Sequence, residues 1–294
     1  MELIKAKTIM TKVKDGSDWY DVDYNMNLYR GCMHGCIYCD SRSNCYHIDN
    51  FDVPKGKENA LNILEKELSK YKRGVVGIGS MSDTYNLFEK KYEQTRGALK
   101  LISKYKFGVS IDTKSDLILR DIDLLKEINS KNNVIIKFTI TIPRDELSKI
   151  IEPNVCVSSK RLKAIKELSD NGIFTGIMMN PVLPFITDNE EDIKKLVKLA
   201  YENGAKFIHT YMGMTLRENQ RDYYFDMLDK YFPTLKEKYI KYYGQRYNCA
   251  VPNYKKLYKV FTDECDKYGI LYNMKDIIKV YKKDIKESEQ ISLF

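Results

Sequence analysis

Short β-rich runs alternate with helical patterns along the first two thirds of the chain, and this alternation limits the possible folds more than any other feature. The runs lie at 23–29, 74–80, 107–113, 134–141, 173–180 and 206–212. Apolar residues at helical spacing fill the stretches between them, at 60–71, 90–104, 116–130, 158–171 and 189–203. Strands joined by helices form a parallel sheet with the helices outside. The pattern therefore predicts an α/β fold with six strands, either as an open sheet or as an incomplete barrel.

The pattern changes after about residue 213, where helical stretches follow one another without strands. We expect helices at 215–232, 253–268 and 274–285. The chain then has three parts: an N-terminal segment at 1–22, a β/α unit at 23–212, and a helical C-terminal region at 213–294. We expect this last part to cover part of the β/α unit.

Composition narrows the class of protein. With 43% hydrophobic and 31% charged residues the chain is expected to build a globular core. No apolar run approaches the roughly 18 residues of a membrane span, and the first residues do not resemble a signal peptide. We expect a cytoplasmic protein with reduced cysteines. The net charge of +8 suits a nucleic-acid binder, but the lysines are spread among acidic residues in no basic run.

The cysteines of "NLYRGCMHGCIYCDSRSNCY" are the strongest chemical signal. Cys32, Cys36 and Cys39 have C-x₃-C-x₂-C spacing, and Cys45 follows closely. In a reducing compartment, such close spacing indicates a metal or catalysis rather than disulfides. Three thiolates in one loop hold three irons of a [4Fe–4S] cluster and leave the fourth iron open.

Zinc is the alternative metal for this loop. A structural zinc site needs four closed ligands, usually from paired C-x₂-C units, and only one such pair is present. His34 and His47 lie close enough in sequence to complete a zinc shell. The spacing of the three cysteines favours the iron–sulfur cluster.

The C-x₃-C-x-aromatic-C pattern after the first strand resembles that of the radical S-adenosylmethionine superfamily. The motifs "GSMSDTYNLFE", "TKSDLILRDIDLL" and "NPVLP" follow in order. With "YRGCMHGCIYC" they resemble the subfamily related to spore photoproduct lyase, over about residues 24–210. The resemblance implies an incomplete (β/α)6 barrel, with reactive groups at the C-terminal ends of its strands.

The resemblance also implies a chemistry. Cys32, Cys36 and Cys39 would ligate the cluster, and the open iron would bind S-adenosylmethionine. Reductive cleavage would then yield a 5′-deoxyadenosyl radical that abstracts hydrogen from a substrate. An electron donor such as flavodoxin or ferredoxin is expected. The substrate is not identified, and a nucleic acid or nucleotide is the closest analogy.

Several residues match positions that bind S-adenosylmethionine in the family. Tyr38 is expected to touch the adenine, although loop packing would also explain an aromatic here. Ser82 and Asp83 match the position that holds the methionyl amino group, and turn capping is the simpler explanation for both. Lys114 matches the partner of the methionyl carboxylate, and a lysine at such a strand end has few other uses.

Other residues have weaker assignments. Thr139 and Thr141 share a strand face, and one of them is expected to bind the same carboxylate unless both only pack. His209 ends the sixth strand, where a packed histidine is more common than a functional one. We interpret five charged residues of the family-like motifs as salt-bridge or loop-ordering residues: Arg30, Arg96, Arg120, Asp121 and Arg161.

The chain departs from the lyase at one important position. The lyase carries a cysteine just before the residues that align with "MSD", and its thiol returns a hydrogen atom to the product radical. Ser80 stands there in this chain, and its O–H bond is too strong for that step. We therefore expect Cys45 or Cys249 to serve as the catalytic thiol. Cys156 and Cys265 are more simply explained as buried small residues.

The polar sequence after the sixth strand has two explanations. Arg217 and Arg221, four residues apart, would share one helix face and contact an anionic substrate, or that helix is simply a solvated amphipathic one.

Two functions from other classes also fit parts of the sequence. One is a zinc- or cluster-bearing nucleic-acid-binding module without catalysis. The other is a cluster-dependent redox or sensor protein that does not use S-adenosylmethionine. Lys114 and "GSMSD" at the strand ends argue against both.

Overall fold

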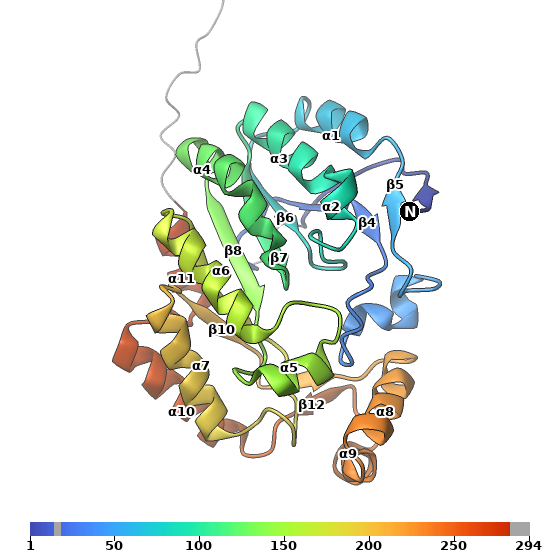
Figure 1. The fold of residues 1–294 in the computed structure, drawn as a ribbon, viewed down its shortest axis with the longest axis vertical. Helices are drawn as coiled ribbons and strands as arrows, with labels where there is room; N and C mark the ends of the chain where they lie inside the picture. The colour runs from blue at the N-terminus through green and yellow to red at the C-terminus, as the bar shows by residue number, and fades with distance from the viewer. Residues whose placement is uncertain (15–18, 283–294) are drawn as a thin grey trace, which may run out of the picture.

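A seven-stranded sheet forms the centre of the computed structural model, which describes residues 1–14 and 19–282 (Figure 1). Its strand order is β10-β9-β8-β7-β6-β3-β2, and all neighbours are parallel except β2 with β3. The strands are β2 (Met10–Lys12), β3 (Tyr24–Met26), β6 (Val75–Ile78), β7 (Gly108–Thr113), β8 (Val134–Thr139), β9 (Phe174–Met179) and β10 (Ile208–Thr210). The α/β fold and its six predicted parallel strands are confirmed.

Helices connect these strands as predicted. They include α1 (Ala60–Leu68), α3 (Gln94–Lys104), α4 (Ile122–Lys131), α6 (Ser158–Asp170) and α7 (Glu190–Glu202). The predicted helix at 90–104 is broken at Glu93, whose φ of 47° separates α2 (Glu89–Tyr92) from α3. The predicted helix at 116–130 starts as the 3-10 helix η3 (Asp116–Asp121), and α5 (Asp145–Ile151) was not predicted.

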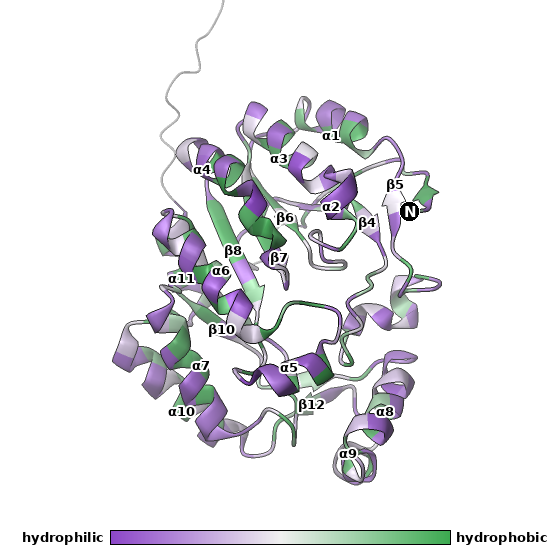
Figure 2. Ribbon diagram, viewed as in Figure 1, coloured by the Kyte–Doolittle hydropathy of each residue, from purple (hydrophilic) through white to green (hydrophobic). Residues whose placement is uncertain are grey.

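Burial explains why the central strands have continuous apolar runs. All six residues of β8 are buried, because helices cover one face of the sheet and other segments cover the second face. Figure 2 shows β8 as a largely hydrophobic strand with a hydrophilic stretch, beside helices whose outer sides are hydrophilic. That hydrophilic stretch lies within a buried element, so its polar groups need partners inside the protein.

Two small sheets lie outside the central one. In the first, β5 (Lys55–Lys57) pairs with β1 (Leu3–Ile4) and with β4 (Tyr29–Arg30), which immediately precedes the cysteine loop. The second is an antiparallel pair, β11 (Gly213–Thr215) with β12 (Asn248–Ala250). The cysteines themselves lead into two short 3-10 helices, η1 (Asp40–Arg42) and η2 (Asn44–Tyr46).

The C-terminal region is mainly helical, with one unpredicted addition. It contains α8 (Gln220–Tyr231), α9 (Leu235–Tyr243), α10 (Tyr254–Tyr268) and α11 (Met274–Tyr281). The paired strands β11 and β12 and the helix α9 were not predicted, and residues 283–285 of the last predicted helix lie outside the described part. Figure 1 shows α10 beside α7, and α8 and α9 paired at the other side of β12.

The first and last described segments meet on the face of the sheet that the connecting helices leave open. Tyr20 from the N-terminal segment and Ile277 and Tyr281 from α11 form one buried cluster with strand residues such as Ile135 and Phe207. The Tyr281 hydroxyl donates to the backbone carbonyl of Tyr20. Among the described residues, no helix has the length and hydropathy of a membrane span.

Candidate functional site

One cavity of about 210 Å³ gathers most of the residues predicted to act together. It lies between the cysteine loop and the C-terminal ends of β6, β7 and β8, where the parallel sheet predicts the reactive groups. Eight predicted residues line it: Cys32, Cys36, Tyr38, Cys39, Ser82, Asp83, Lys114 and Thr139. Three others do not line it, namely Cys45, Thr141 and Cys249. Thr141 is buried and its hydroxyl has no hydrogen-bond partner among the described residues.

The cysteine loop turns sharply before its first thiol. Gly31 has a φ of +84°, and a Cβ at this position would lie 2.7 Å from the backbone oxygen of Phe51. A glycine is therefore required both for the conformation and for the close approach. The turn brings the Cys32 N–H to donate to the same Phe51 oxygen at 2.8 Å. Farther along, the Ile37 N–H donates to the backbone oxygen of Ile151 at 3.0 Å.

The three thiols of the cavity are protonated when they stand alone. Burial raises the pKa of Cys32 to about 11 and also raises the pKa of Cys36 and of Cys39. The nearby ammonium of Lys114 opposes this effect at Cys36 and Cys39. Because a metal binds the thiolate, loading the site must release protons.

The donors of the cavity are three cysteine thiols, which is the set that three irons of a cluster require. Within residues 1–14 and 19–282, no three His, Cys, Asp or Glu side chains converge to hold one metal ion. The three thiols instead line one cavity, as ligands to three separate irons would. Of the two histidines considered for zinc, His47 is exposed, and His34 lies with its Nδ1 3.6 Å from the Asp83 carboxylate.

Asp83 joins the end of β6 to the end of β7. Its carboxylate accepts hydrogen bonds from the Thr113 hydroxyl at 2.9 Å and from the backbone N–H of Lys114 at 2.7 Å. The neighbouring Ser82 hydroxyl donates to the Gly31 carbonyl at 2.5 Å. Both residues therefore order the loops around the cavity, as capping residues do, and a role in binding a ligand amine stays a prediction.

Lys114 supplies a positive charge that no described carboxylate neutralises by an ion pair. Its ammonium lies 5.9 Å from the centre of the Tyr38 ring. Burial alone would lower the pKa of Lys114, but the thiolate form of Cys36 and the carboxylates of Glu152 and Asp83 raise it, so the net shift of this pKa is upward. A cation in this position suits an anionic group of a ligand.

A fully buried ion pair supports the loop from the sheet side. Arg161 donates to the Glu152 carboxylate at 2.5 Å and to the backbone oxygen of Thr139 at 2.8 Å, and both charged side chains are 0% exposed. The Tyr38 hydroxyl donates to the same carboxylate. The predicted salt bridge of Arg161 is thus confirmed, and it links strand β8 to the aromatic residue between two cysteines.

The other predicted salt-bridge residues form a second network beneath α3 and η3. Arg96 pairs with the buried Asp121 at 2.7 Å, and Arg120 pairs with Asp121 at 2.9 Å and with the buried Glu89 at 3.2 Å. Arg30 donates instead to a backbone carbonyl of the cysteine loop. Their interpretation as salt-bridge or loop-ordering residues is confirmed.

The C-terminal region holds the loop from the opposite side, which sequence reasoning missed. Gln220 is 0% exposed, and its amide donates to the backbone oxygens of Tyr38 at 3.0 Å and Thr215 at 2.8 Å. Its side-chain oxygen accepts from the Arg217 N–H at 2.8 Å. Asp40 accepts from the Thr215 hydroxyl at 2.8 Å and from the Arg217 guanidinium at 2.9 Å.

One expectation about this region is wrong. Arg217 and Arg221 do not share a helix face, because α8 begins only at Gln220. Arg221 donates to three backbone carbonyls, those of Leu216, Gly244 and Arg246. Both arginines therefore have partners within the protein.

The two cysteines predicted to be catalytic lie apart from the cavity. Cys45 is exposed and accepts from the Ser43 hydroxyl at 3.2 Å. Cys249 is buried on β12, where burial raises its pKa to about 11. Cys265 is buried in the core through α10, as expected. Ser80 lines the cavity at the position where the resemblance placed a thiol.

Two further cavity residues, Trp19 and Asp112, had no individual role assigned from the sequence. His209 lies behind Trp19, with ring centroids 5.1 Å apart, and burial lowers its pKa. Asp112 lies 3.3 Å from the buried Lys137. A sequence signal existed for Lys137, because it interrupts the apolar run "VIIKFTIT" of a buried strand.

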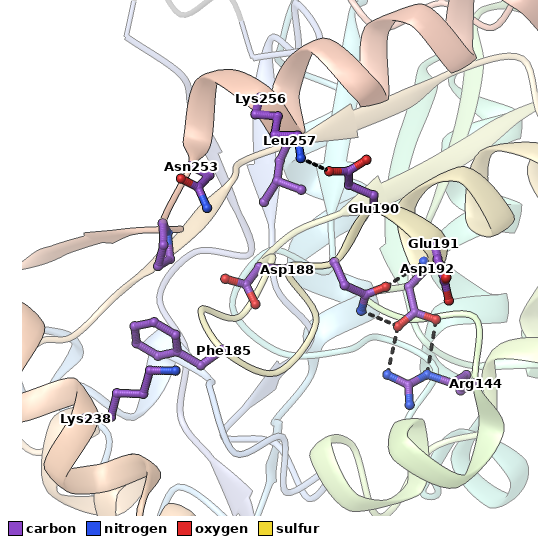
Figure 3. Close-up of a pocket in the computed structure, with 12 residues that line it drawn as sticks. Arg144, Phe185, Asp188, Glu190, Glu191, Asp192, Lys238, Asn253, Lys256 and Leu257 are labelled. Atoms are coloured by element: carbon purple, nitrogen blue, oxygen red, sulfur yellow. Dashed lines mark hydrogen bonds and ion pairs between the residues drawn. The ribbon is translucent and has the colours of Figure 1, made fainter.

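A second, larger cavity of about 920 Å³ shares no lining residue with the first (Figure 3). It lies among α7, α9 and α10, and none of the predicted site residues lines it. Its charges largely satisfy one another: Arg144 pairs with Asp192 at 2.8 Å, and Lys256 pairs with Glu190 at 2.6 Å. The chemistry of the thiols therefore belongs to the smaller cavity.

Comparisons with known proteins give the family and the relatives of this chain. The family profile of the radical SAM superfamily matches residues 26–200, which is more than half of the chain. An uncharacterized protein of Mycobacterium tuberculosis is 28% identical over 242 residues, covering 80% of this chain and 71% of its own length. An uncharacterized protein of Methanocaldococcus jannaschii is 36% identical over 170 residues, covering 57% of this chain and 63% of its own length.

Solved structures share the fold. A spore photoproduct lyase complexed with a dinucleoside spore photoproduct superimposes with a TM-score of 0.67 at 16% identity, covering 90% of this chain and 79% of the lyase chain. A point mutant of spore photoproduct lyase gives a TM-score of 0.66 with the same identity and coverage. At this identity the likeness establishes a common fold.

Proposed function

The chain belongs to the radical SAM superfamily, and we propose that its smaller cavity holds a [4Fe–4S] cluster with S-adenosylmethionine beside it. One observation carries the proposal: eight residues from the cysteine loop and three strand ends, far apart in sequence, line a single cavity. Cys32, Cys36 and Cys39 would each ligate one iron and leave the fourth open. The six parallel strands would act as an incomplete (β/α)6 barrel that positions these groups.

When both are bound, the cluster and S-adenosylmethionine supply reductive cleavage to a 5′-deoxyadenosyl radical that abstracts hydrogen. The residues of the chain bind and orient. The free ammonium of Lys114 would pair with the methionyl carboxylate, and Asp83 would accept from the methionyl amine with its remaining lone pairs. Tyr38, fixed through Glu152, would pack against the adenine, and Thr139 would hydrogen-bond the same ligand.

The proposed substrate is a nucleic acid or a nucleotide. Support comes from the shared fold with a lyase whose structure contains a dinucleoside photoproduct. The reaction should differ from that of the lyase at the final hydrogen transfer, because Ser80 lines the cavity in place of a thiol. Cys45 and Cys249 remain our candidates for a hydrogen donor, and either would have to approach the cavity to act. A flavodoxin or ferredoxin would supply the electron.

The test is an anaerobic reconstitution with iron and sulfide, followed by reduction, addition of S-adenosylmethionine and assay of 5′-deoxyadenosine. We expect about four irons per chain and nucleoside formation, both lost in Cys39→Ala. Cys265→Ala removes a thiol from the core of α10 and is the matched control, which should keep both. Nucleoside formation by Cys39→Ala at the wild-type rate would overturn the cluster assignment.

A second arm addresses the substrate. The reconstituted protein is assayed with and without ultraviolet-damaged DNA, and dimer loss is measured beside the nucleoside. Stimulation by DNA would support a nucleic-acid substrate, and dimer loss would show that Ser80 does not prevent photoproduct reversal. Nucleoside formation with no DNA effect would argue against damaged DNA as the substrate and leave the radical chemistry intact.

A further inference from the structure

One wall of the cavity contains a carboxylate and an aromatic side chain, those of Asp112 and Trp19, that have no role in binding the cluster. Asp112 lies on β7, which ends at Thr113, and Lys114 follows directly after the strand; both side chains line the cavity. Asp112 therefore lies deeper in the sheet than Lys114. A chain of contacts joins Asp112 to Trp19. The Lys137 ammonium lies 3.3 Å from the Asp112 carboxylate and 4.3 Å from the centre of the Tyr20 ring. The centres of the Tyr20 and Trp19 rings are 5.3 Å apart.

Lys137 holds the Asp112 carboxylate in place. The Lys137 side chain is 1% exposed, and its ammonium donates to the Ser110 hydroxyl at 2.7 Å. Burial lowers the pKa of Lys137 and raises that of Asp112, and each charge opposes the shift of the other. A buried lysine is costly without a partner, so the pair persists as a unit. The Asp112 side chain is 21% exposed and lines the cavity, which leaves it able to accept from a ligand.

Trp19 gives the same wall an aromatic surface. The side chains of Tyr20 and His209 hold it by T-shaped contacts at 5.3 Å and 5.1 Å, while 42% of its surface is exposed. An exposed indole is a favourable surface for another planar ring. The wall therefore combines a ring-packing surface with an oriented acceptor whose charge is balanced by Lys137.

We propose that this wall is a substrate subsite for an uncharged planar heterocycle with a ring N–H. The ring packs against Trp19, and its N–H donates to the Asp112 carboxylate. The inference rests on the proposed function, since it names the class of molecule from which hydrogen is removed. The balanced Asp112–Lys137 pair favours an uncharged ring, because an anionic ring would face the carboxylate.

Trp19 is the only tryptophan of the chain and reports on its own site. The intact protein, with and without reconstituted cluster, is titrated with uridine and with 3-methyluridine while tryptophan fluorescence is followed. We expect a saturable change with uridine and an affinity at least tenfold weaker for the methylated ring, because the buried acceptor then lacks its donor. Calorimetry with Trp19→Ala, which should also bind uridine at least tenfold more weakly, checks the packing contact.

Variants separate the subsite from general effects. Asp112→Asn should weaken uridine binding at least tenfold, whereas Asp188→Asn, in the second cavity, should leave it unchanged. Should Asp112→Asn fail to fold, the double variant Asp112→Leu/Lys137→Met removes both charges together and should fold without responding to uridine. Wild-type affinity in either Asp112 variant would overturn the proposal.

A titration with S-adenosylmethionine completes the test. Equal binding of both uridines would overturn the subsite, and the fluorescence change caused by S-adenosylmethionine alone, which is proposed to bind in the same cavity, serves as the baseline. Iron content and 5′-deoxyadenosine formation are measured on the same preparation. Their loss alongside selective uridine binding would contradict the proposed radical chemistry but support the subsite, so the two failures are distinguishable.

Discussion

The cysteine loop is held on two sides by networks of opposite character. On the sheet side, Glu152 and Arg161 form a pair with both side chains 0% exposed. On the C-terminal side, Asp40 and Arg217 form a pair with side chains 34% and 33% exposed, next to the buried amide of Gln220. Both networks reach Tyr38, one through its hydroxyl and the other through its backbone carbonyl.

This difference in exposure separates contacts that stabilise the fold from contacts that only hold the cysteine loop in position. A buried charge that loses its partner cannot turn to water, so breaking the first pair should strongly destabilise the protein. A half-exposed pair has water as a substitute and should matter less. We therefore expect the sheet-side network to fix the fold around the cavity and the C-terminal network to fix the loop within it.

The largest effect is expected from Arg161→Met. It leaves the Glu152 carboxylate buried without its partner and should lower the free energy of unfolding by about 3–5 kcal/mol. Arg144→Met is the matched control, since Arg144 pairs with Asp192 but is 47% exposed, and it should cost at most about 1 kcal/mol. Denaturant unfolding measures both, and equal losses would remove the distinction between the two kinds of pair.

Removing both charges sharpens this point. The double variant Glu152→Leu/Arg161→Met should be more stable than Arg161→Met alone by at least about 1 kcal/mol, because no unpaired charge remains. The same unfolding measurement, completed with Glu152→Leu, gives the coupling energy. A double variant less stable than either single variant would indicate that packing, rather than charge, sets the cost.

Gln220→Ala should have an intermediate effect. It leaves the carbonyls of Tyr38 and Thr215 and the N–H of Arg217 without their partner and should cost about 1–3 kcal/mol. We also expect faster iron loss to a chelator from the reconstituted protein, because the loop between the thiols is less fixed. Asn219→Gly, which removes one partly buried hydrogen bond to the backbone oxygen of Arg42, is the control. Unchanged iron retention in Gln220→Ala would limit the role of Gln220 to stability.

The smallest effect is expected from Arg217→Ala, which should lower the free energy of unfolding by about 0–1 kcal/mol. This effect should shrink between about 0.05 M and 1 M salt, because salt screens half-exposed charges. The decrease in the free energy of unfolding caused by Arg161→Met should stay nearly constant over the same range of salt concentration. Urea unfolding at the two salt concentrations tests the contrast, and a salt-independent loss in Arg217→Ala would show that its contacts act by packing.

The sequence predicted the elements with strong local signals. The six parallel strands followed from the alternation of short β-rich runs with helical patterns, and most of the cavity-lining residues came from the resemblance to the radical S-adenosylmethionine superfamily. The contacts of Gln220, Trp19 and Asp112 escaped prediction because partners of all three lie far away in sequence. Gln220 reaches Tyr38 across 182 residues, and no local pattern marks such a contact. The break at Glu93 escaped for another reason, since a single left-handed residue leaves the helical apolar spacing on both sides intact.

The contact between the first and last described segments has a consequence for biosynthesis. Tyr20 and Tyr281 are 261 residues apart, and α11 completes the cover of the inner sheet face. The last strand of the central sheet, β10, ends at Thr210, so at roughly 5–20 residues per second the emerging chain exposes that apolar face on the ribosome for several seconds. Chaperones would have to protect the nascent chain during this interval. A chain truncated before Met274 would retain all three cluster cysteines and the whole central sheet, yet aggregate.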